Sequence, residues 1–125
     1  MRVLVLKDSV LNPKEISGEL ESLQVEVNGY IEIPFICETL RDNNIDLIIN
    51  EEGKFDGSNP EIVIANKDGS IVDIIFGNCV FTSHNNDGDT IGLTLYQQNV
   101  VHDLIKEKNY IIYNDKIFKV RVIRV

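Results

Sequence analysis

The sequence predicts an α+β fold in a single domain, with a mostly antiparallel sheet of short strands, two helices and a C-terminal β-hairpin. The chain has 125 residues, which fits one domain that can bury a core without crosslinks. Two β-branched runs, residues 62–65 and 71–76, are joined through Asp68-Gly69, which is a strong hairpin signal. Thr94 and Gln97 have the spacing of a helix capping box.

The first part of the chain is expected to form a strand and then a helix. Residues 1–7 alternate and are rich in β-forming types, and Asn12-Pro13 punctuates the connection that follows them. Residues 18–27 place Leu20, Leu23 and Val27 at helical spacing, with glutamates on the opposite side. Gly29 is well placed to end this helix, because glycine adopts the left-handed conformation at little steric cost.

Two further strands frame a charged turn. Residues 30–33 alternate as a strand, and residues 46–49 are typical of a more buried one. The stretch Asn50-Glu51-Glu52-Gly53-Lys54 follows this second strand directly. We expect a tight turn there rather than a reactive site, because Gly53 can supply a positive φ and further turn residues follow.

The second half is expected to contain hairpins and the longer helix. Residues 79–82 and 90–93 flank a polar loop and predict a second hairpin, in which the loop lacks the ligand spacing of a calcium site. The longer helix is predicted over residues 95–108. The tail, residues 109–125, is predicted to form a hairpin packed on the domain of residues 1–108, with basic side chains along its outer edge.

Charge is unevenly distributed along the chain. The formal net charge is −8; residues 1–105 carry 6 basic and 18 acidic side chains, whereas residues 106–125 carry 6 basic and 2 acidic ones. Because nucleic-acid binding depends on Lys and Arg displacing counterions, the acidic body argues against direct binding of nucleic acid. The scattered acidic residues are typical of a solvated face, and mimicry of nucleic acid stays open.

Few side chains point to catalysis. Cys37 and Cys79 lie in apolar contexts without Cys-x-x-Cys spacing, so we expect reduced core residues. His84 and His102 have no partner at ligand spacing, and no glycine-rich phosphate loop is present. No apolar run reaches membrane-spanning length, and none resembles a signal peptide. The sequence thus predicts a non-enzymatic protein of the cytosol, without metal or cofactor.

The order of several motifs resembles a known family. The opening Met1-Arg2-Val3-Leu4-Val5, then Gly29-Tyr30-Ile31-Glu32, Asn50-Glu51-Glu52-Gly53-Lys54 and Gly77-Asn78-Cys79-Val80-Phe81 are similar to a small family of unknown function, domain of unknown function 3846, found in phages, prophages and mobile elements of bacteria. The resemblance covers about residues 1–106. It implies a phage-encoded accessory protein that acts inside a bacterium, and it assigns no chemistry.

Our leading functional hypothesis is a counter-defence protein that sequesters a small nucleotide-derived immune signal, assisted by homo-oligomer formation. Such a ligand needs an aromatic face for its base and cations or amides for its phosphates. The residues expected to supply these groups are Tyr30, Asn50, Lys54, Asn78, Phe81, Thr82 and Lys106. Tyr30 and Phe81 alternate within strands, which fits a core position as well.

The alternative hypothesis comes from a different class of protein. An acidic surface that imitates nucleic acid could occupy the basic site of a host defence protein or DNA-handling protein and inhibit it. Such binding would weaken steeply as salt is raised and would involve no small molecule.

Overall fold

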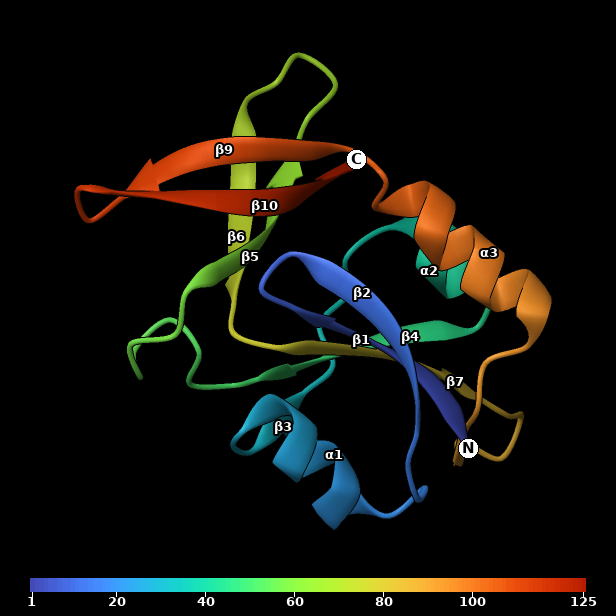
Figure 1. The fold of residues 1–125 in the computed structure, drawn as a ribbon. Helices are drawn as coiled ribbons and strands as arrows, with labels where there is room; N and C mark the ends of the chain where they lie inside the picture. Colours follow the sequence, from blue (N-terminus) through green and yellow to red (C-terminus); the bar gives the residue numbers. More distant parts are fainter.

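The computed structural model describes residues 1–125 and confirms the α+β prediction, with ten strands and three helices (Figure 1). The strands of the first sheet are β1 (Arg2–Lys7), β2 (Val10–Glu15), β3 (Ile31–Glu32), β4 (Ile45–Asn50), β7 (Cys79–His84) and β8 (Thr90–Ile91). Their order is β2-β1-β7-β4-β3, with β8 paired to β7, and every pairing is antiparallel.

The second sheet contains β5 (Pro60–Ala65), β6 (Ile71–Phe76), β9 (Lys108–Tyr113) and β10 (Lys116–Arg124). Its order is β6-β5-β10-β9. The β5–β6 and β9–β10 pairs are antiparallel, as the hairpin predictions required, whereas β10 runs parallel to β5. The C-terminal strand is therefore an interior strand that extends the β5–β6 hairpin into a sheet.

Three helices complete the fold, namely α1 (Leu20–Val27), α2 (Glu38–Asp42) and α3 (Leu95–Leu104). Helix α1 covers one face of the first sheet, where its Leu23 and Val27 form a small core with strand residues. The opposite face packs against the second sheet, α2 and α3 (Figure 1). That main core includes Leu4, Leu6, Leu40, Leu47, Ile62, Ile64, Ile75, Phe81, Val101, Ile105 and Ile123.

The first helix ends differently from the prediction. Asn28, with φ of 60°, takes the left-handed position that was assigned to Gly29. Asparagine tolerates this conformation because its short polar side chain can bond locally. Gly29 is instead required by close packing, since a Cβ on it would lie 2.6 Å from the side-chain nitrogen of Asn50.

Other local differences have similarly simple causes. Helix α3 ends at Leu104 rather than at residue 108, because Lys108 already begins β9. Pro13 lies within β2, where an edge strand tolerates the missing N–H. Helix α2 was not predicted, since its five residues are too few to show a period.

The basic tail also lies differently from the prediction. Lys116 and Lys119 belong to β10, and they lie in the part of that strand that pairs with β9, whereas β5 pairs only with Arg121–Arg124. Arg121, on the same strand, is buried with 8 % exposure. Of the basic residues in the tail strands, only Lys108 lies on the edge strand β9. The hairpin edge that β9 forms is therefore not basic beyond Lys108.

None of the three helices combines the length and the apolar character that crossing a bilayer requires.

Candidate functional site

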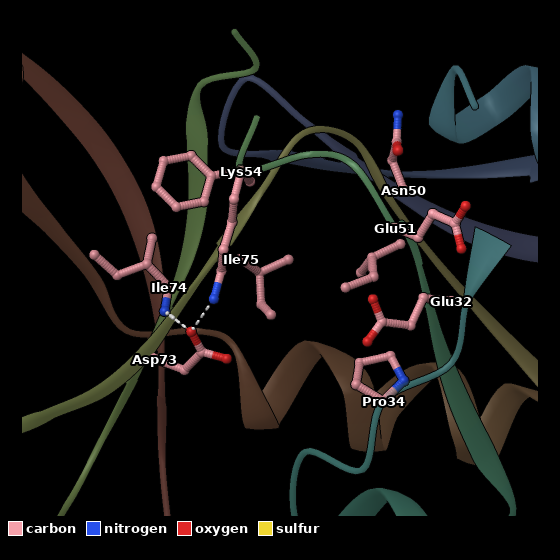
Figure 2. A pocket seen from close by; sticks show the side chains of 10 residues that line it. Glu32, Pro34, Asn50, Glu51, Lys54, Asp73, Ile74 and Ile75 are labelled. Atoms are coloured by element: carbon pink, nitrogen blue, oxygen red, sulfur yellow. Dashed lines mark hydrogen bonds and ion pairs between the residues drawn. The ribbon is translucent and has the colours of Figure 1, made fainter. Parts of the chain in front are cut away.

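Two of the predicted site residues, Asn50 and Lys54, line the same hollow, which we call the charged hollow (Figure 2). It lies between the ends of β3 and β4 and the strand β6, and its volume is about 130 Å³. Its polar lining consists of Glu32, Asn50, Glu51, Lys54 and Asp73, and apolar residues of β4 and β6 contribute to the rest.

The turn after β4 positions this lining. The N–H of Gly53 donates to the carbonyl of Asn50 at 3.1 Å, so the stretch from Asn50 to Lys54 is a turn, as predicted. Gly53 does not have a positive φ. It is glycine because a Cβ there would lie 2.5 Å from the carbonyl oxygen of Phe76. The turn thus packs directly on β6, which brings Lys54 to Asp73.

Lys54 is already paired within the charged hollow. Its Nζ lies 2.7 Å from Oδ1 of Asp73, which also accepts the N–H of Ile74 at 2.8 Å (Figure 2). Partial burial of Asp73 acts to raise its pKa, but these two hydrogen bonds outweigh the burial and hold that pKa below the ordinary value. Lys54 would have to leave this carboxylate to bind a phosphate.

Asn50 is committed to the fold rather than to a ligand. Its side-chain nitrogen donates to the carbonyls of Val27 and Asn28, at 3.2 and 3.0 Å, and to Oδ2 of Asp56 at 3.1 Å. Its side-chain oxygen accepts the N–H of Glu52 at 2.7 Å. The residue is 5 % exposed. Because an amide has only two N–H donors, no donor of Asn50 is left for a ligand.

The aromatic residues proposed for stacking lie in opposite environments. Tyr30 is 70 % exposed, and its carbonyl accepts the N–H of Glu51 at 3.0 Å, so it lies next to the charged hollow. Phe81 is 0 % exposed and belongs to the main core, so it presents no face to a surface ligand. Its assignment to stacking is therefore corrected to a core role.

The remaining predicted residues do not join the charged hollow. Thr82 is completely buried, and its hydroxyl has no hydrogen-bond partner. Asn78 donates to the carbonyl of Glu26 at 3.4 Å and lines another, polar hollow. Lys106, just beyond α3, pairs with Asp103 at 3.1 Å. The seven residues thus do not form one site.

Sequence reasoning missed a histidine–aspartate pair. Nδ1 of His84, at the end of β7, lies 3.0 Å from Oδ2 of Asp46 on the neighbouring strand β4. Both residues line a mainly apolar hollow of about 210 Å³, together with Cys37. The two partners are 38 positions apart, so only the pairing of β4 with β7 brings them together.

A second missed feature is a buried pair of opposite charges. Glu61 on β5 is 4 % exposed, and Arg121 on β10 is 8 % exposed. The backbone of Ser9 links them, because its N–H donates to Oε2 of Glu61 at 3.2 Å and its carbonyl accepts Nε of Arg121 at 3.0 Å. Burial raises the pKa of Glu61 and lowers that of Arg121. Glu61 also lines the polar hollow that contains Asn78.

Cys79 is not placed for nucleophilic chemistry. Its side chain is fully buried and its thiol donates to the carbonyl of Gly77 at 3.4 Å. Burial in an apolar environment raises the pKa of this thiol strongly, which opposes formation of the reactive thiolate.

Comparison with known proteins agrees with the resemblance drawn from the motifs. No match to the chain was found among curated proteins or among solved structures. A family model covers residues 1–107, which contain every element from β1 to α3 and leave both β9 and β10 outside. On that match, the chain belongs to the family described as Domain of unknown function (DUF3846).

Proposed function

We propose that the protein acts by stoichiometric binding rather than catalysis, and that its acidic surface occupies a basic site on another protein. The setting that we propose is the one implied by the resemblance to phage and prophage proteins. There the chain would serve as an accessory protein that inhibits a host defence protein or a DNA-handling protein.

The observation that carries this proposal is the charge of the hollow. Three carboxylates, those of Glu32, Glu51 and Asp73, line it, against the single cation of Lys54. That cation is neutralised by Asp73 at 2.7 Å. An anionic ligand would meet uncompensated negative charge from Glu32 and Glu51, whereas a lysine or arginine of a partner would be attracted.

The acidic character continues beyond the hollow. Glu52 and Asp56 lie on the same turn as Glu51, and both are exposed without an ion-pair partner. Asp56 is held beside Asn50 by its hydrogen bond to that residue. We call Glu32, Glu51, Glu52 and Asp56 the acidic face. Three of its carboxylates, those of Glu51, Glu52 and Asp56, lie on a turn that is fixed by Asn50 and Gly53, so little ordering is needed on binding.

The small-molecule hypothesis is a second candidate, supported by the exposed side chain of Tyr30, whose backbone is bonded to Glu51 of the charged hollow, and by Lys54, which lines that hollow. A volume of about 130 Å³ is below the roughly 300 Å³ at which ligand pockets begin, so a nucleotide would remain largely exposed. The charge of the hollow gives no help with phosphates, which is why this candidate ranks second.

The experiment compares two sets of charge-neutralised proteins. One variant combines Glu32→Gln, Glu51→Gln and Glu52→Gln on the acidic face. The matched control combines Asp87→Asn, Asp89→Asn and Asp115→Asn, three exposed residues in the β7–β8 loop and the β9–β10 turn. Each immobilised protein is presented with a bacterial lysate at increasing salt and in the presence of competing duplex DNA.

We expect the wild type and the control to retain a partner that salt and DNA release, and the acidic-face variant to lose it. Equal retention by both variants would contradict the proposed surface. Thermal shifts with cyclic dinucleotides and ADP-ribose-type nucleotides are measured in parallel. A rise in melting temperature with one of these would instead favour the small-molecule candidate, because a ligand of the native state stabilises it by mass action.

A further inference from the structure

The edges of the two sheets differ in how well they are protected against pairing with another strand. On the first sheet, β2 contains Pro13 and ends in charged residues, and β3 has only two residues. On the second sheet, β6 carries Asp73 at its centre, and its pairing with β5 is irregular at two places. Proline, charge, irregularity and shortness all discourage edge-to-edge pairing.

The edge strand β9 has none of these protections in its central part. Its sequence from Lys108 to Tyr113 is regular, six residues long, free of proline, and carries its one charge at the beginning. Its pairing with β10 is regular over the whole strand. The basic residues that we expected to guard this edge lie on β10 instead.

The turn before β10 determines which backbone groups of β9 face outward. Asn114 and Asp115, with φ of 49° and 63°, form a two-residue turn of the type that makes its flanking residues a hydrogen-bonded pair. Tyr113 and Ile111 therefore direct their N–H and C=O groups to β10, and the residues between them direct theirs away. Those outward residues are Tyr110 and Ile112. The N–H of Tyr110 is occupied by Oδ1 of Asn109, at 2.8 Å.

The side chains of these outward residues form an apolar surface. Tyr110 is 66 % exposed and Ile112 is 77 % exposed, on the same face of the hairpin. Ile117 of β10, directly opposite Ile112, is 71 % exposed. In Figure 1 this hairpin extends well beyond the layers formed by α1 and the first sheet. Three large exposed apolar side chains at adjacent positions are typical of an interaction surface.

We propose that β9 pairs antiparallel with β9 of a second copy of this chain, about a two-fold axis at Ile111. The two second sheets then join into one continuous sheet. Tyr110 of each copy lies opposite Ile112 of the other. The N–H of Ile112 donates to the C=O of Tyr110 across the axis, and the N–H of Tyr110 exchanges Oδ1 of Asn109 for the C=O of Ile112.

A second copy of the chain suits this edge because β9 meets the requirements for pairing with another β9 about a two-fold axis. Directly opposed residues must lie on the same face of the joined sheet, and Tyr110 and Ile112 do. Tyr110 and Ile117 then extend one apolar surface across both copies. Lys108 lies opposite the turn residue Asn114, so no two lysines of the edge strands face one another. Charge therefore does not oppose this register.

The first experiment measures the molar mass in solution by light scattering across a range of protein concentrations. We expect the wild type to approach twice the chain mass. Ile112→Pro should remain monomeric, because it removes an outward N–H that β10 does not use. The matched control, Val25→Lys, changes a similarly exposed apolar side chain, 76 % exposed, on α1 and should retain the dimer.

The second experiment uses the wild type alone and does not depend on a variant that folds. Hydrogen exchange is followed at single amides as the protein is concentrated. The Tyr110 and Ile112 amides should become protected on dimer formation, whereas the Ile111 amide, bonded to β10, should be protected at every concentration. The proposal is overturned by a monomeric wild type, by a dimer in which the Ile112 amide stays unprotected, or by an Ile112→Pro protein that still dimerises.

Discussion

The side-chain amide of Asn50 donates to the backbone carbonyl of Asn28 at 3.0 Å, across 22 positions of the chain. Asn28 is the left-handed residue that ends α1, and Asn50 ends β4 just before the charged turn. One buried side chain therefore joins the end of a helix, the end of a strand and the turn that carries the acidic face. The geometry of the proposed binding surface depends on this contact.

Asn50→Ala is expected to destabilise the protein by about 2 to 3 kcal/mol, because it leaves the buried carbonyl of Val27 and the carbonyl of Asn28 without donors. The measurement is the free energy of unfolding in urea. Asn59→Ala is the control, since Asn59 is exposed and its side chain makes no hydrogen bond; its effect should stay within about 0.5 kcal/mol. Equal effects of the two substitutions would show that the Asn50 contacts do not stabilise the fold.

Gly29→Ala is expected to be destabilising by about 1 to 3 kcal/mol, because its Cβ would lie 2.6 Å from the side-chain nitrogen of Asn50. The cost should fall when Asn50 is already alanine, since the group that it would strike is then absent. Unfolding free energies of the two single variants and the double variant test this coupling. Strictly additive effects would place the cost of the new methyl group elsewhere, for example in the conformation of the backbone.

Glu61 should make a contribution to stability that decreases as pH rises. Burial raises its pKa in the folded protein above the ordinary value of 4.5. The contribution is thus complete below pH 4.5 and is lost as pH increases through the raised pKa of the folded state. Urea unfolding of the wild type and of Glu61→Gln across this range isolates the effect, because the other groups cancel in the difference. If the wild type instead gained stability relative to the variant as pH rises, this prediction would be contradicted.

Gln97→Glu should destabilise the protein more than Thr94→Ala does. The capping box needs only the oxygen of residue 97, which accepts the N–H of Thr94 at 2.9 Å, and a glutamate retains that oxygen. The substitution removes the N–H groups that donate to the carbonyl of Asn43 and to Oγ of Ser83, both at 2.9 Å. We expect losses of about 2 kcal/mol for Gln97→Glu and about 1 kcal/mol for Thr94→Ala. Thermal unfolding at one pH ranks the stabilities of the two variants. If Gln97→Glu were as stable as the wild type, the role of Gln97 would be limited to the helix cap.

Local rules account for what could be predicted of the fold. The turns at Asp68-Gly69 and Asn114-Asp115 and the capping box of Thr94 and Gln97 depend on neighbouring residues, and all three are present. The candidate site could be predicted only in part. The turn from Asn50 to Lys54 is local, but the partner of Lys54, Asp73, lies 19 positions away. Alternation identified Phe81 as a strand residue, but it did not show that the face to which its side chain points is the main core.

The sequence by itself determined the class of fold, the hairpins, the capped helix and the family, because each is encoded by residues that are close along the chain. Only the tertiary structure decided that β10 lies between β5 and β9, which buries Arg121 and Glu61 around the backbone of Ser9 and leaves β9 as the edge. The order of strands in a sheet is set by packing between distant segments. Which charges become neutralised, and which backbone groups stay free, follows from that order.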